Sequence, residues 1–151
     1  MVCLGNICRS PLAEGIMRSK LTEEFFVDSA GTISMHQGNA PDKRSIKTAA
    51  KHGIDISKQT SRPITLDDLN MFDKIYCMDL NNFKDVKAIA KTEEQRNKIS
   101  LVMEAADLKN YPIEVPDPYW DEIDGFEKVF HQLNDACEKI AKNLINSSNQ
   151  N

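Results

Sequence analysis

The sequence predicts an α/β domain in which helices cover a parallel β-sheet. Its 151 residues fit a single domain, residues 1–151, that can bury a substantial core. Hydrophobic residues make up 40% of the chain and charged residues 28%, as is usual for a globular protein. Short apolar runs alternate with segments whose apolar residues recur at helical spacing, and this alternation is typical of parallel sheets between helices.

The helices can be placed from their start and stop signals. Pro11 stands where a first helical turn tolerates it, and apolar residues recur after it at helical spacing. Asp42 can cap a second helix, with Gly53 as its stop. Further helices are expected over residues 80–90 and, with one continuous apolar face, after the proline-rich loop that ends at Pro118. The polar residues 146–151 are expected to form a frayed tail.

The strands are expected to be short and apolar. Residues 25–27, 74–78 and 99–103 have this character, and the first of these runs leads into a turn at residues 28–31. In such a fold a phosphate-binding loop normally follows the C-terminal end of a strand, so a strand would also have to precede such a loop near the N-terminus.

Composition and charge exclude several classes of function. The net charge of −4 gives no general attraction to nucleic acid, and no apolar run is long enough for a signal peptide or a membrane span. The four cysteines are interpreted as thiols in a reducing compartment, which indicates a cytoplasmic protein. His36, His52 and His131 lack metal-ligand spacing with other ligands, so neither a metal site nor a cofactor is predicted.

The residues that carry chemistry lie in the segment Cys-Leu-Gly-Asn-Ile-Cys-Arg-Ser-Pro, which begins at Cys3. Gly5 and Asn6 accept positive φ angles, so successive backbone N–H groups can turn inward and form an anion-binding nest. Arg9 can add two charge-assisted hydrogen bonds to phosphate oxygens, and the following helix directs its positive end at the same place. These features favour the reactive thiolate form of Cys3, which Ser10 can stabilise by a hydrogen bond.

The segment resembles the signature loop of the low-molecular-weight protein tyrosine phosphatases. The resemblance runs from residue 2 to about residue 145 and includes similar segments that begin at Val27, His52, Cys77 and Asp117. It implies a three-layer α/β/α fold with a four-stranded parallel sheet and two-step hydrolysis of phosphotyrosine through a phosphocysteine intermediate. Phosphotyrosine-containing proteins are the implied partners, and the protein is expected to be a monomer or a weak dimer.

The resemblance also assigns roles to individual residues. Cys3 is the expected nucleophile and Asp117 the general acid and base, while Arg9 and the loop amides hold the phosphoryl group. Ser10 is expected to support the thiolate. Asn6 is expected to brace the loop, and Ser29 to hold Asn6 in place. The phosphate-binding amides are those of Leu4, Gly5, Asn6, Ile7, Cys8 and Arg9.

The walls of the expected substrate pocket are Met35, Tyr119 and Trp120. Packing of Trp120 in the core or on the surface is an equally weighted alternative, and the flexible side chain of Met35 suggests a loose wall. Cys8 is expected to protect the oxidised nucleophile as a reversible disulfide, as a second loop cysteine does in the family.

The start of the sequence leaves alternatives open. Only Met1 and Val2 precede Cys3, whereas a strand usually has five or six residues, so the first strand is expected to be truncated. An internal start within a longer chain accounts for this, and so does a strand donated by a neighbouring molecule. A catalytically impaired phosphoprotein-binding domain is a further possibility, and an arsenate reductase on the same scaffold is the nearest alternative enzyme.

Overall fold

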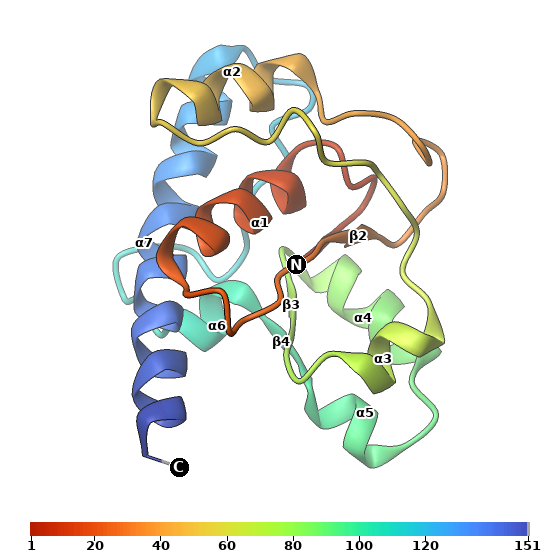
Figure 1. Cartoon of the computed structure of the whole chain (residues 1–151). Helices are drawn as coiled ribbons and strands as arrows, with labels where there is room; N and C mark the ends of the chain where they lie inside the picture. Colours follow the sequence, from red (N-terminus) through yellow and green to blue (C-terminus); the bar gives the residue numbers. More distant parts are fainter. Residues whose placement is uncertain (151) are drawn as a thin grey trace.

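The computed structural model describes residues 1–150, which form a four-stranded sheet between two groups of helices (Figure 1). All strand pairs are parallel, and the strand order is β2-β1-β3-β4. The strands are β1 (Val2–Cys3), β2 (Ala30–Gly31), β3 (Ile75–Cys77) and β4 (Ile99–Leu101). The α/β fold with a four-stranded parallel sheet that the sequence predicts is therefore confirmed.

Helices connect the strands and cover both faces of the sheet. Figure 1 shows α1, α2, α6 and α7 on one side of the sheet, with α7 running along the edge of the molecule, and α3, α4 and α5 on the other side. Among residues 1–150, no helix is both long and apolar enough to cross a bilayer. The helices are α1 (Arg9–Lys20), α2 (Lys43–Lys51), α3 (Leu66–Met71), α4 (Leu80–Ile89), α5 (Glu93–Asn97), α6 (Val102–Ala106) and α7 (Ile123–Asn149).

The alternation of side chains along the strands produces two separate cores. Tyr76 faces the larger core with α1, α6 and α7, whereas its neighbours Ile75 and Cys77 face the smaller core with α3 and α4. Val2 and Cys3 divide in the same way. Because both faces of the sheet are covered, its strands are mostly apolar, with Ser100 in β4 as the polar exception.

The first strand is central although it has only two residues. Val2 pairs with Ala30 on one side and with Cys77 on the other. The peptide groups at its ends continue these ladders, since Ala30 N donates to Met1 O at 3.0 Å and Met78 N donates to Val2 O at 3.0 Å. The strand is as short as the sequence predicts, and it nevertheless joins both halves of the sheet and ends at Cys3.

Three elements differ from the sequence-based predictions. Residues 25–27 form no strand, because pairing with β1 begins only at Ala30, and Phe26 is 65% exposed and stacks on Phe72. Residues 102–103 begin α6 rather than continue β4. Helix α7 extends to Asn149 and so includes much of the segment expected to be frayed, since no Gly or Pro interrupts it there.

Helix α2 has the boundaries that the sequence predicts, and its cap has a further role. The carboxylate of Asp42 accepts a hydrogen bond from Arg44 N at 2.8 Å, and its side chain also pairs with the Arg44 guanidinium at 3.0 Å. Gly53 follows the helix with φ of 78°. Burial by itself raises the pKa of Asp42, but the N–H groups of Arg44 outweigh it and hold that pKa below its usual value.

Substituting Asp42→Ala should lower the free energy of unfolding by about 1–2 kcal/mol near pH 7, because the cap and the ion pair are both lost. The folded-state pKa of Asp42 is depressed, so its stabilisation is present above the unfolded-state pKa and is lost as the pH falls through the folded-state value. Urea unfolding at pH 7 and below pH 4 tests this. The exposed substitution Lys47→Ala on the same helix is the control, and equal unfolding curves for the two variants would contradict the assignment.

Candidate active site

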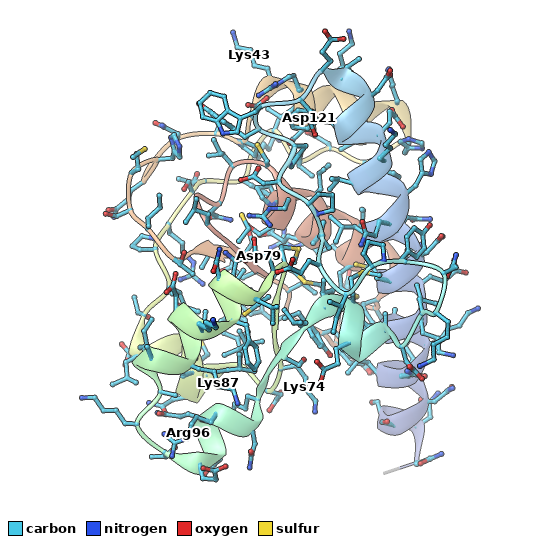
Figure 2. The ribbon with its side chains drawn as sticks, turned by 180° about the vertical axis from the view of Figure 1, so that it is seen from behind. Lys43, Lys74, Asp79, Lys87, Arg96 and Asp121 are labelled. Carbon is cyan, nitrogen blue, oxygen red and sulfur yellow. The ribbon has the colours of Figure 1, made fainter. Side chains whose placement is uncertain are left out.

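The site lies where the order of the strands reverses, at the carboxyl ends of β1 and β3. In open parallel sheets this crevice is the usual ligand site. Cys3 ends β1, the loop follows, and Arg9 begins α1. Figure 2 shows Asp79 in the middle of the molecule, at the start of α4, and Asp121 above it, in the loop that leads into α7.

The loop conformation depends on Asn6, which has a φ of 56° and is buried. Of the two residues expected to take positive φ, only Asn6 does so; Gly5 does not. Gly5 is instead closely packed, since a Cβ there would lie 2.9 Å from Cδ2 of His36 and the histidine ring would have to move. Gly31 has a similar role on the other side of the loop, where a Cβ would lie 2.8 Å from the carbonyl oxygen of Leu4.

The side chain of Asn6 is the centre of a buried hydrogen-bond network. Its Nδ2 donates to Ser10 Oγ at 2.8 Å and to Ser29 Oγ at 2.9 Å, and its Oδ1 accepts from the backbone N–H of Arg62 at 3.0 Å. Ser29 Oγ in turn donates to Glu14 at 2.8 Å. The network therefore ties the loop to α1, to the end of the segment before β2 and to the segment before α3.

The same network orients Ser10 toward the sulfur of Cys3. Ser10 Oγ accepts from Asn6, so its own hydrogen is available for Cys3 Sγ, which lies 3.0 Å away. The backbone N–H of Asn6 also points at the sulfur, at 3.3 Å. Two hydrogen-bond donors, one from a side chain and one from the backbone, are therefore directed at this sulfur atom.

An anion-binding nest lies beside this sulfur. Among residues 1–150, the backbone amides of Gly5, Ile7 and Cys8 have no hydrogen-bond acceptor, and no side chain caps the N-terminus of α1. These N–H groups and the positive end of a 12-residue helix meet at the loop. The loop lines a cleft of about 330 Å³ together with Cys3, Arg9 and Asp117.

Arg9 is buried and is held by groups from two other elements. Its Nη1 donates to Asp79 Oδ2 at 2.6 Å and to the carbonyl oxygen of Val115 at 3.0 Å, while Asp117 Oδ2 lies 3.7 Å from its Nη2. Burial by itself lowers the pKa of Arg9, but the Cys3 sulfur and the two carboxylates raise it above its ordinary value. The guanidinium therefore remains charged and fixed in orientation before any substrate arrives.

Asp117 stands on a loop that is attached at both ends. Val115 N donates to Met78 O at 2.9 Å, which ties the loop to the end of β3. On the other side of Asp117, Arg44 from α2 donates to the carbonyl oxygens of Tyr119 at 2.9 Å and Asp121 at 2.8 Å. The structure thus brings Asp117 to the same cleft as Cys3, with little freedom for the loop to swing.

Met35, Tyr119 and Trp120, the expected walls of the substrate pocket, line the cleft together with Ile33 and His36. Trp120 is 89% exposed, which excludes a place in the core, and Met35 is 76% exposed. Tyr119 is 37% exposed, and its ring meets that of Trp120 edge to face at a centroid distance of 4.9 Å. The rim of the cleft is therefore aromatic and accessible, whereas its floor is polar and buried.

Three residues of the site were missed in the sequence. Asp79 orients Arg9, Glu14 ends the network of Asn6, and Arg44 holds the loop of Asp117. Asp79 directly follows an apolar strand, and a polar residue at that edge of a parallel sheet is a signal that sequence can provide. Glu14 and Arg44 lie in helices among many charged residues and carry no such signal.

The fold also brings two of the histidines close to a carboxylate. In the sequence Glu127 and His131 are four residues apart, whereas His52 is distant from both. The fold brings His52 and His131 within reach of Glu127, and possible ligand atoms of all three residues lie within 4.8 Å of one another. This proximity is not visible in the sequence, because His52 is on a different helix from the other two residues.

Comparison with known proteins agrees with this geometry. Residues 1–150 match the family described as low molecular weight phosphotyrosine protein phosphatase. The low molecular weight phosphotyrosine protein phosphatase of Schizosaccharomyces pombe is 36% identical, over 95% of this chain and 94% of its own. The human protein of that name is 39% identical, over 90% and 88%. A crystal structure of a protein tyrosine phosphatase from Entamoeba histolytica, with Hepes in its active site, superposes with a TM-score of 0.91 at 37% identity and covers 97% of this chain and 96% of its own.

The chain belongs to the low molecular weight phosphotyrosine protein phosphatase family. It is a protein tyrosine phosphatase, and the family resemblance seen in the sequence is confirmed.

Replacing Asn6→Ala should lower the free energy of unfolding by about 2–4 kcal/mol, because three hydrogen bonds are lost and alanine must adopt a left-handed conformation. Hydrolysis of p-nitrophenyl phosphate should fall about 10–100-fold in kcat/KM as the nest loses its shape. Denaturant unfolding and steady-state kinetics measure both effects. The exposed Asn39→Ala variant should stay within about 0.5 kcal/mol of the parent, and equal behaviour of the two variants would refute the central place of Asn6.

Proposed function

We propose that this protein hydrolyses phosphotyrosine, and aryl phosphates in general, through a phosphocysteine intermediate. Cys3 is the nucleophile, Arg9 and the loop amides bind the phosphoryl group, and Asp117 transfers the protons. The observation that carries the proposal is that a sulfur atom with two directed donors, a fixed guanidinium and a carboxylate meet in one cleft beside unpaired backbone amides.

In the first step the Cys3 thiolate attacks phosphorus and the bond from phosphorus to the phenolic oxygen breaks. Asp117 in its acid form gives its proton to the departing phenolate, so that tyrosine leaves neutral. The negative charge on the transferring group is balanced by Arg9 and by the amides, which need no reorganisation because they are already in place.

In the second step water attacks phosphorus and Asp117 accepts one of its protons. The phosphorus–sulfur bond breaks, its electron pair returns to Cys3, and inorganic phosphate leaves. The hydroxyl of Ser10, 3.0 Å from the sulfur, stabilises the thiolate as it departs. The side chain of Asn6 supports both steps indirectly, since it sets the orientation of Ser10.

The shape of the cleft supports an aromatic substrate. Cys3 lies at a buried floor, and Tyr119 and Trp120 stand at the rim. An aryl ring can span the distance between the rim and the sulfur, whereas the short side chain of phosphoserine holds its phosphate close to the peptide backbone. Met35 on the facing side is exposed and flexible, which allows rings of different size to enter.

Two alternatives are less well supported. An arsenate reductase needs further cysteines to relay a disulfide, but Cys77 and Cys137 are buried in the cores, where burial raises the pKa of each thiol to about 12. A phosphoprotein-binding domain without activity needs Arg9 and the nest but has no use for Asp117, which nevertheless lies 3.7 Å from the guanidinium.

Cys3→Ser should abolish the hydrolysis of p-nitrophenyl phosphate, and Asp117→Asn should lower kcat about 100-fold or more, because the leaving group then receives no proton. Turnover by the parent protein should persist in a metal chelator at mildly acidic pH. Asp124→Asn, in the first turn of α7, is the matched control and should retain activity. Full activity in the Cys3→Ser variant, or none in the folded parent protein, would reject the proposal.

We further propose that Cys8 protects Cys3 from irreversible oxidation. Both cysteines line the same cleft, and the negative charges of Asp42 and Cys3 add to burial in raising the pKa of Cys8 to about 12. Cys8 is therefore a neutral thiol in the resting enzyme and does not compete with Cys3. Peroxide converts Cys3 to a sulfenic acid, and the sulfur of Cys8 then displaces water to form a disulfide, which a dithiol reduces.

After exposure to hydrogen peroxide, dithiothreitol should restore activity to the parent protein but not to Cys8→Ser, whose Cys3 proceeds to the sulfinic acid. Mass spectrometry of peptides should show a Cys3–Cys8 crosslink in the parent protein alone. Cys137→Ser is the control and should recover like the parent. Recovery of Cys8→Ser to the same extent would dismiss this role.

A further inference from the structure

Three side chains that can bind a metal meet on the outer surface, where the end of α2 lies against α7. His52 caps the C-terminus of α2, and Glu127 and His131 stand one turn apart on α7. His52 Nε2 lies 3.0 Å from Glu127 Oε2, and His131 Nε2 lies 3.7 Å from the same oxygen. None of the three residues lines the catalytic cleft.

These separations fit a tetrahedral metal site. Zinc binds imidazole nitrogen and carboxylate oxygen at about 2.0–2.2 Å, so two ligand atoms of one tetrahedral ion are about 3.3–3.6 Å apart. The observed distances of 3.0 and 3.7 Å lie on either side of this range, and all three ligand atoms are within 4.8 Å of one another. Small side-chain rotations suffice to place an ion among them.

The site is partly organised before any ion binds. The ring of His52 stacks on Phe130 at a centroid distance of 4.0 Å with 10° between the planes, which fixes its orientation. Lys51 lies 3.9 Å from Oε1 of Glu127 and so leaves Oε2 available to a metal. His131 is exposed, which provides a path of entry and leaves room for a water molecule as fourth ligand.

We propose that His52, Glu127 and His131 bind a divalent transition-metal ion, with Zn²⁺ as the best fit. Two imidazoles and one carboxylate suit zinc and its neighbours in the first row, whereas Mg²⁺ and Ca²⁺ prefer all-oxygen sites. The ion joins the C-terminal end of α2 to α7, two helices that are far apart in the sequence. Since α2 also carries Arg44, the ion holds in place the helix that supports the loop of Asp117.

The test uses the Cys3→Ser variant, because the thiolate of Cys3 would itself bind zinc. Isothermal titration at pH 7.5 should show one Zn²⁺ per chain, and the melting temperature should rise by about 5–10 °C at a hundredfold excess over Kd. Titration with Co²⁺ should give visible bands of a site with nitrogen and oxygen ligands, without thiolate charge-transfer absorption. Mg²⁺ should produce neither effect.

Glu127→Gln and His131→Gln, in the same background, should each weaken Zn²⁺ binding by about 100-fold. Glu138→Gln on the same helix, which removes only an exposed pair with Lys142, should bind like its parent. Zn²⁺ binding of unchanged affinity in His131→Gln, or no Zn²⁺ binding by the folded Cys3→Ser protein at millimolar concentration, would overturn the proposal. This outcome is independent of the phosphatase mechanism, because the tested protein lacks the nucleophile.

Discussion

The left-handed conformation of Asn6, together with its three side-chain hydrogen bonds, is the constraint on which the active site depends. Without this conformation of Asn6, the backbone N–H groups of the loop after β1 would not point inward. They would form hydrogen bonds with other peptide groups instead. The conformation costs free energy, and the buried partners Ser10 and Ser29 offset that cost. The result is a rigid cradle in which the sulfur of Cys3 and the amides are in position before substrate binds.

The charged groups of the site are arranged around the guanidinium of Arg9. Asp79 occupies Nη1, and Nη2 faces the weaker contact with Asp117 at 3.7 Å. A phosphate dianion can therefore engage Nη2 without breaking the pair that orients the guanidinium. Because the whole chain is acidic, with a net charge of −4, this local arrangement must attract the anion against the average field of the protein.

The sequence alone predicts those parts of the site whose residues are neighbours in the chain. The loop from Cys3 to Ser10 is continuous, so its residues and their roles could be predicted from one segment and from its family resemblance. Contacts between distant segments could not be predicted from the sequence, since Glu14 and Arg44 act through partners 15 and 75 or more residues away. The strand expected at residues 25–27 is absent, because pairing with β1 starts only at Ala30. Asp79 could have been predicted from the sequence, since it directly follows an apolar strand. The cluster around Glu127 could not, because it depends on how α2 packs against α7.

The cleft has a buried floor and an exposed rim, and these two parts differ in how readily evolution can change them. Met35 and Trp120 make few contacts within the fold, so substitution at these positions costs little stability. A substitution at Asn6 or Arg9 alters several buried partners at once. Descendants of this sequence can therefore acquire new substrates by altering the rim while the chemistry stays the same, and a protein engineer can follow the same route.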